Sequence, residues 1–174
     1  AVRHGLSGRL RIAVVPTALT WAARLAARYG AKHPNVGFTI LSRSSVEILQ
    51  MIEDLEVDAG ISYLDNEPLG KVSSVPLYDE RYTLVTPEGH PLAAGRAVAW
   101  SALEGQRLCL LSPDMQNRRI INRRLAEAGV NPTATVESNS TVVLVSQVLA
   151  GGWLTILPQD IAWFLAQGKP LSLV

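Results

Sequence analysis

The pattern of apolar and polar positions in the first half of the chain predicts strands and helices in the order β-α-β-α-β. β-branched runs closed by proline or small polar residues predict strands, and apolar positions at helical spacing predict the helices between them. The second helix is expected to bury Val46, Leu49, Ile52 and Leu55 on one face. This order predicts an α/β fold with a parallel sheet and helical crossovers. The expected strands are 9–16, 36–41 and 57–62, and the expected helices are 19–29 and 46–55.

The pattern restarts in the second half. Two extended pieces are predicted in 72–87, and a short helix is expected after residue 95. We therefore expect two α/β halves, 1–85 and 86–174. Because the chain stops in "GKPLSLV", we expect its C-terminal end to be truncated, so that the first half lacks its return segment. The remaining predicted segments are strands 107–112, 133–138 and 153–158 and helices ending at 129, 150 and 167.

Four predicted strand-to-helix loops are rich in Ser, Thr, Asn or Gln: 16–19, 42–45, 112–119 and 138–141. In such sheets ligands bind beyond the carboxyl ends of the strands. Backbone N–H groups and helix dipoles at these loops suit an anionic or strongly polar small molecule. The alternative is helix capping, which also favours these residue types, with Thr17 capping the first helix. Four such loops contain more polar groups than caps require, which favours a binding site.

The segment "NRRIINRRL" places Arg118 and Arg119 at a predicted helix start, where cations oppose the helix dipole. This position favours one of the pair, for which we take Arg118, reaching the carboxylate of a ligand. An ordinary surface arginine is the alternative.

Composition narrows the function. The net charge of +1 argues against this stretch gripping a nucleic-acid backbone by itself. The single cysteine, Cys109, cannot form an internal disulfide; it is expected in a core strand, and its context fits a cytoplasmic protein. The chain lacks an apolar run of the ~20 residues that a membrane span needs. Residues 1–10 resemble a linker and contain no signal-peptide apolar region.

Catalysis has little support in the sequence. His4, His33 and His90 lie outside the four polar loops, and the sequence contains no HExxH, CxxC, GxSxG or GxGxxG arrangement. We therefore expect no catalytic residue, no metal ligand and no cofactor.

Several segments, in order, resemble the effector-binding domain of LysR-type transcriptional regulators. "GLSGRLRIAVVPT" is similar to the opening strand of that family, and "VPLYDERYTLVTPEGHPLA" to its most recognisable stretch. "ESNSTVVLVSQVLAGGWLTILP" is similar to its "e..s.e.l..lVaaGlGialP" pattern. Two positions depart from the family: Trp153 replaces a common glycine, and Tyr63 stands where some relatives have a charged contact. We expect Trp153 to narrow the ligand cleft or shift helix 141–150.

The resemblance implies two Rossmann-like lobes, as in type 2 periplasmic binding proteins, with a small effector in the cleft between them. It also implies a winged helix-turn-helix N-terminal to this chain that carries DNA binding, and self-association as dimers and tetramers. No membrane partner is implied. Family ligand contacts fall by position on Thr17, Ser44, Ser45, Ser112, Pro113, Asn117, Asn139 and Ser140.

We therefore expect a ligand-sensing domain of a bacterial transcriptional regulator, in which a polar or anionic metabolite alters DNA binding. An extracytoplasmic solute-binding protein of a transporter is the main alternative, because it shares the fold and the cleft. An enzyme on the same fold is the third, since the sequence offers no acid–base pair for it.

Overall fold

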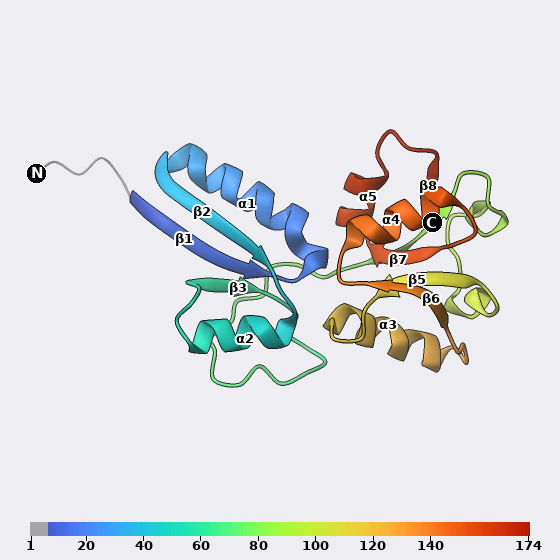
Figure 1. Cartoon of the computed structure of the whole chain (residues 1–174), viewed down its shortest axis with the longest axis horizontal. Helices are drawn as coiled ribbons and strands as arrows, with labels where there is room; N and C mark the ends of the chain where they lie inside the picture. The colour runs from blue at the N-terminus through green and yellow to red at the C-terminus, as the bar shows by residue number, and fades with distance from the viewer. Residues whose placement is uncertain (1–6) are drawn as a thin grey trace, which may run out of the picture. The chain divides into compact units, whose positions relative to one another are not determined.

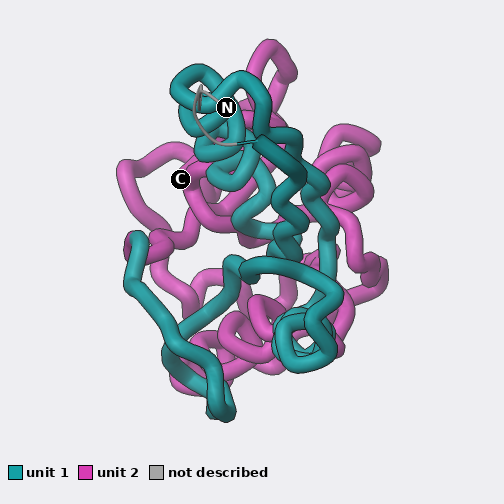
Figure 2. The backbone as a smooth tube through the Cα atoms, turned by 90° about the vertical axis from the view of Figure 1, so that its left-hand side faces the viewer, with its two compact units in different colours: residues 1–77 teal, residues 78–174 magenta. Residues whose placement is uncertain are grey.

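The chain divides between Leu77 and Tyr78 into two units, distinguished by colour in Figure 2. The structure is a computed structural model that describes residues 7–174. Residues 1–6 of the expected linker, including His4, lie outside the described part. The expected division after residue 85 falls inside strand β4 (Tyr82–Pro87), which pairs only within the second unit in the described part of the chain.

The first unit is built on a three-stranded parallel sheet in the order β2-β1-β3. Val14 pairs with Ser42 of β2 and with Ile61 of β3, so the three strands end side by side. Helices α1 and α2 flank this sheet (Figure 1). The predicted β-α-β-α-β order is confirmed. Its elements are β1 (Ser7–Val14), the 3-10 helix η1 (Pro16–Ala18), α1 (Leu19–Lys32), β2 (Asn35–Ser42), α2 (Ser45–Glu53) and β3 (Ala59–Ile61).

The core of the first unit forms where α2 packs on the sheet. Ile48 of α2 is buried together with Ala13 and Val14 of β1. A Cβ atom on Gly60 of β3 would overlap Cγ2 of Ile48, so the absence of a side chain lets the helix approach the strand closely. Beside this strand, Asp58 Oδ2 accepts the Arg11 backbone N–H at 2.8 Å.

The predicted buried face of α2 is wrong at its ends. Val46 is 64% exposed and Leu55 is 89% exposed, whereas Ile48 is buried. Leu55 lies beyond the last helical residue, Glu53, and has a φ of 57°, so it has left the helical face altogether. The middle of the predicted face is retained, because Ile52 packs against the core cluster that contains Ile48.

The second unit contains antiparallel and parallel strand pairs. β4 pairs antiparallel with β7 and with β8, whereas β5 and β6 are parallel. A parallel bridge between Leu108 and Leu154 joins the two groups of strands. Residues 72–81, all described, form no strand, so only one of the two extended pieces predicted in 72–87 is correct, and β8 was not predicted. The elements are β4, the 3-10 helices η2 (Pro91–Ala93) and η3 (Trp100–Leu103), β5 (Arg107–Leu111), α3 (Gln116–Glu127), β6 (Thr133–Ser138), α4 (Thr141–Ala150), β7 (Thr155–Pro158), α5 (Gln159–Ala166) and β8 (Leu171–Leu173).

Strand β5 is buried on both faces. Leu108 and Leu110 pack in the cluster that contains Ile121 and Leu125 of α3. Cys109 and Leu111 point into the other cluster, which contains residues of α4 and α5. This alternation follows from the two-residue period of a strand and explains the continuous apolar run that predicted it. The prediction that Cys109 is a core strand residue is confirmed.

Candidate functional site

The first unit gathers its polar loops at the carboxyl edge of its sheet. The Arg43 backbone N–H donates to Val14 O at 2.9 Å, which ties the loop after β2 to the end of β1. The Val15 N–H donates to Ile61 O at 3.1 Å, which ties the segment after β1 to the end of β3. The loops that contain Thr17 and Ser45 therefore leave one edge, as the sequence predicted.

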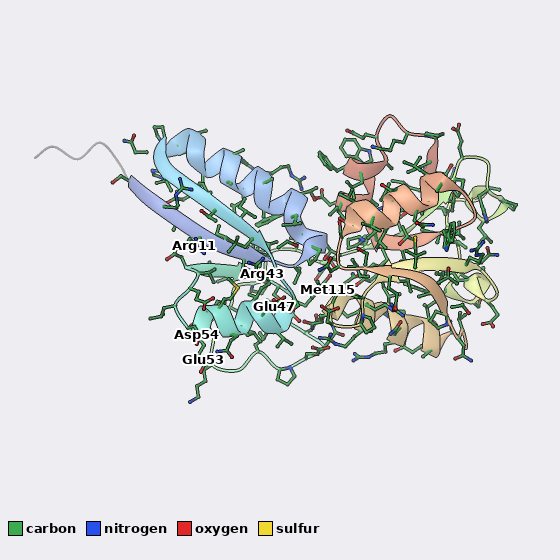
Figure 3. All side chains as sticks on the ribbon, in the orientation of Figure 1. Arg11, Arg43, Glu47, Glu53, Asp54 and Met115 are labelled. Atoms are coloured by element: carbon green, nitrogen blue, oxygen red, sulfur yellow. The ribbon has the colours of Figure 1, made fainter. Side chains whose placement is uncertain are left out.

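Ser44 is a helix cap. Its Oγ accepts the Glu47 backbone N–H at 3.2 Å, and Glu47 Oε1 accepts the Ser44 backbone N–H at 2.9 Å. Figure 3 labels Glu47 in the first turn of α2. This reciprocal capping box satisfies two backbone donors of the helix start. For Ser44 the capping interpretation is correct.

Ser45 is different. It is the first residue of α2 and only 5% exposed, and its Oγ has no hydrogen-bond partner among the described residues. A buried hydroxyl without a partner costs about 1–3 kcal/mol. Because Ser44 already caps the helix, capping does not explain why a hydroxyl is kept at position 45.

Thr17 does not cap α1 as expected. The N-cap of α1 is Ala18, which makes no side-chain cap bond within the described chain. The Thr17 hydroxyl instead lies 2.7 Å from the hydroxyl of Tyr63. Tyr63 follows β3 by two residues, so it leaves the same edge of the sheet. Tyr63 is not among the expected ligand contacts, although its position directly after a predicted strand indicates that it lies at the same edge as the polar loops.

The second unit gathers its polar loops in the same way. Leu111, the last residue of β5, pairs with Ser138, and the Ser112 N–H donates to Ser138 O at 2.9 Å. Ser140 is the N-cap of α4, yet its side chain makes no cap bond within residues 7–174. Its backbone N–H donates to Ser138 Oγ at 3.1 Å. The loops after β5 and β6 therefore share one edge and leave α4 without a side-chain cap.

The first turn of α3 contains three consecutive buried polar residues, Gln116, Asn117 and Arg118. Its N-cap is Met115, labelled in Figure 3, which provides no side-chain cap in the described structure. Buried polar side chains are usually retained for specific partners. Gln116 lies in the predicted polar loop 112–119 but is not among the expected ligand contacts.

Arg118 is held by groups of its own unit. Its Nη1 donates to Leu111 O at 2.8 Å and forms an ion pair with Glu137, and its Nε donates to Asn122 Oδ1 at 2.9 Å. These bonds join the first turn of α3 to the ends of β5 and β6. A direct contact between Arg118 and an effector stays a prediction.

The two remaining predicted residues are exposed. Asn139 lies at the tip of the loop after β6, and the carbonyl oxygen of Pro113 accepts a hydrogen bond from Arg119 Nη1 at 2.9 Å. Thr17, Ser44 and Ser45 thus belong to the edge of the first unit, and the other predicted residues belong to the second. Of the described helices α1, α2, α3 and α4, α2 alone has an N-cap side chain that accepts a backbone hydrogen bond, and that residue is Ser44.

Trp153 does not lie near these loops of its unit. Its Nε1 donates to Thr135 Oγ1 at 2.6 Å, and the Arg107 guanidinium carbon lies 4.2 Å from the centre of a Trp153 ring. Arg107 opens β5 and Thr135 lies early in β6, so the ring covers the amino ends of these strands. α4 has its predicted bounds, so the expected shift of this helix is not seen, and a narrowing of the ligand cleft by Trp153 stays a prediction.

The described residues provide no candidate metal site, and Cys109 is buried. Residues 7–174 contain no group of three or more His, Cys, Asp or Glu side chains that could hold a metal ion. Burial raises the pKa of the Cys109 thiol to about 11, so it is protonated at neutral pH. None of the described helices combines the length and the apolar character that crossing a membrane requires.

Both α/β units gather polar loops at the carboxyl ends of their parallel strands, which is where α/β sheets usually bind ligands. The protein family described as "LysR substrate binding domain" matches residues 3–171 of the chain. The chain therefore belongs to this family and is an effector-binding domain of a LysR-type transcriptional regulator. This family is non-enzymatic.

Similar proteins agree with this assignment. The chain is 28% identical to the uncharacterized HTH-type transcriptional regulator YfeR of Shigella flexneri over 95% of its own length and 54% of that protein. It therefore spans about half the length of this curated relative. Two solved structures share the fold, each with a TM-score of 0.80: the Synechocystis PCC6803 CcmR regulatory domain in complex with 2-PG (20% identity, 96% of this chain, 80% of that one) and the QuiR effector-binding domain in complex with shikimate (19%, 97% and 80%).

Proposed function

We propose that this chain senses a small polar or anionic metabolite and thereby alters DNA binding by a winged helix-turn-helix in the rest of the protein. The observation that carries the proposal is Ser45, a buried hydroxyl without a hydrogen-bond partner among the described residues, beside a helix start that Ser44 already caps. A bound acceptor would satisfy this hydroxyl and use the positive end of the α2 dipole.

The chemistry of both edges favours an anion. Ser45 and Thr17 offer hydroxyls from the first unit, and we assign Asn117, Asn139 and Ser140 as contacts from the second. The starts of α2 and α4 add backbone N–H donors. CcmR and QuiR bind 2-PG and shikimate in similar folds, and shikimate is a carboxylate. We propose that one effector is held in a cleft between the two units, as in type 2 periplasmic binding proteins.

Regulation follows if the effector prefers one arrangement of the units. A ligand that binds two arrangements equally shifts neither population. Thr17 and Ser45 are both buried, and we propose that an effector reaches them through a movement of the groups that cover them. Binding is therefore coupled to a conformational change that the DNA-binding part can use. The transporter alternative loses its support, because the matching family is that of transcriptional regulators.

We further propose that the protein acts in the cytoplasm as an oligomer. Trp163 and Phe164 are adjacent, large and exposed on α5, as expected for a surface that meets another chain. Sedimentation velocity of this chain should show a concentration-dependent dimer that Trp163→Glu weakens. A chain that stays monomeric at about 100 µM, which corresponds to an association free energy weaker than about 5 kcal/mol, would contradict the dimer. Recovery of the full-length protein outside the cytoplasm would contradict the proposed location.

The experiment that tests the sensor is a thermal-shift screen of this chain against inorganic sulfate and phosphate and small mono- and dicarboxylates. A specific effector should raise the melting temperature in proportion to the logarithm of its concentration once the site is saturated. Neutral sugars and primary amides serve as matched controls. Equal shifts from anions and neutral controls would contradict an anion site.

A further inference from the structure

The hydroxyl groups of Thr17 and Tyr63 form a hydrogen bond at the edge of the first unit, and its donor can be inferred from their chemistry. The two hydroxyl oxygens are 2.7 Å apart, and either can act as the donor by geometry. A phenol is a more acidic hydroxyl than the aliphatic hydroxyl of threonine, and an aliphatic hydroxyl is the better acceptor. The favoured arrangement therefore has Tyr63 donating and Thr17 Oγ1 accepting.

This arrangement leaves the proton of Thr17 available to another acceptor. A hydroxyl that accepts a hydrogen bond becomes a stronger donor, because bonds in a chain polarise one another. Ser45 adds a second hydroxyl, buried and without a partner in the described chain, and the α2 start adds the positive end of its dipole. Each of these groups can face a ligand as a donor.

We propose that Tyr63 is a specificity-determining residue of the effector site, which makes the edge of the first unit select an oxyanion, such as a carboxylate, over its neutral amide. The proposal rests on the proposed function, because it assigns the chemical preference of that same site. A carboxylate presents acceptors alone, whereas a primary amide presents an NH₂ group that meets the donor face of Thr17 unfavourably. Without the Tyr63 hydroxyl, Thr17 can turn and accept from an amide.

The register of the sheet supports this role. β1 and β3 are paired in parallel up to Val14 and Ile61, and the Val15 N–H continues the ladder to Ile61 O. Tyr63 and Thr17 therefore leave neighbouring strands at the same level, and a rigid sheet fixes their separation. The Tyr63 ring packs against the core of the first unit, which holds its hydroxyl beside Thr17 at the edge of the sheet.

The test is calorimetric binding of matched acid and amide pairs to the chain and to Tyr63→Phe. The pairs are acetate and acetamide, benzoate and benzamide, and succinate and succinamide, with sulfate as an inorganic oxyanion. For the acid that binds best, Tyr63→Phe should weaken binding about fivefold to tenfold and leave the amide within about twofold, as expected for one hydrogen bond near a charge. General damage to the fold would weaken both members of the pair alike.

Two further variants keep the test decisive. Tyr29→Phe removes a phenol from the other end of α1, about 15 Å along the helix from its start, where its ring packs on His33 and Phe38; it should leave the acid-to-amide ratio unchanged. In a Thr17→Val background, Tyr63→Phe should change that ratio no further.

The outcomes separate the two proposals. If sulfate and every acid fail to bind the unaltered chain, the proposed function itself is overturned. If acids bind and Tyr63→Phe keeps the full preference for them, the sensor stands and the role of Tyr63 is overturned. If Tyr63→Phe still lowers the ratio in the Thr17→Val background, Tyr63 acts directly on the ligand and the relay through Thr17 is wrong.

Discussion

The guanidinium of Arg118 is paired with the carboxylate of Glu137, and the same terminal nitrogen donates to the carbonyl oxygen of Leu111 at 2.8 Å. Leu111 ends β5 one residue before Ser112, and Glu137 precedes Ser138 at the end of β6. One buried cation therefore fixes the two loops that carry the predicted contacts of the second unit. Arg118 therefore holds these two loops in place, and it is also a candidate contact for the effector.

Replacing Arg118 by alanine should lower the free energy of unfolding by about 1–3 kcal/mol, because it leaves the buried carbonyl oxygen of Leu111 without its charged donor. Urea denaturation monitored by circular dichroism measures this. Arg124→Ala, an exposed arginine in the last turn of the same helix, is the matched control and should change stability by less than about 0.5 kcal/mol. An Arg118→Ala chain with unchanged stability but lost anion binding would show a direct effector contact instead.

Ser44 and Ser45 form a matched pair with opposite expectations. Ser44→Ala breaks the capping box and should cost about 1 kcal/mol of stability. Ser45→Ala removes a buried hydroxyl that has no partner among the described residues, so stability should be unchanged or slightly higher, while affinity for the best anion falls about tenfold. Thermal melts and calorimetry on both variants check this. A Ser45→Ala chain that melts lower yet binds normally would assign Ser45 to the fold.

Cys109 should make stability fall at alkaline pH. Its folded-state pKa is raised from 9.0 to about 11, so the folded state holds the proton that the unfolded chain releases. The stability contributed by the protonated thiol is fully present below pH 9 and is lost as the pH rises towards 11, in total about 3 kcal/mol. The difference in unfolding free energy between the unaltered chain and Cys109→Ala, followed from pH 7 to pH 10.5, measures the stability that the protonated thiol contributes. Parallel pH profiles, or rapid iodoacetamide labelling of the folded chain at pH 8, would contradict it.

Gly60 should tolerate no side chain. Its Cβ would overlap Cγ2 of Ile48, so Gly60→Ala must push α2 away from β3 and should cost about 1–3 kcal/mol. Gly30→Ala is the control, because a Cβ there meets no described atom within 4 Å and alanine favours the helix by up to about 1 kcal/mol. Chemical denaturation should therefore show changes of opposite sign. A neutral Gly60→Ala would mean that Ile48 repacks freely.

Local patterns were sufficient for much of the fold. The continuous apolar run in "RLCLLS" and the helical spacing around Ile121 and Leu125 each indicate burial directly, so these elements were predictable. The pairing of β8 with β4 was not, because Leu171–Leu173 is too short to carry a periodic signal and its partner lies more than eighty positions earlier. The exposed ends of α2 were missed because Leu55 lies beyond the end of the helix at Glu53, and because the sheet buries Ile48 while Val46 faces outward.

The candidate site was predictable at the level of loops and not of individual atoms. Parallel strands place their carboxyl ends together, which is why the loops containing Thr17 and Ser45 could be joined from sequence. Which serine caps and which is left without a partner depends on side-chain rotamers, and the sequence "SRSS" does not reveal them. The Thr17–Tyr63 bond depends on a register between strands almost fifty residues apart, which periodicity cannot supply.

The most direct test of the sensor is a two-dimensional ¹H–¹⁵N NMR titration of this chain with the anion that gives the largest thermal shift. Backbone amide shifts should concentrate in the loops at 16–18, 42–46, 112–118 and 138–141, with one common dissociation constant for the loops of both units. Shifts confined to one unit, or to surfaces away from the carboxyl edges of the sheets, would contradict the account.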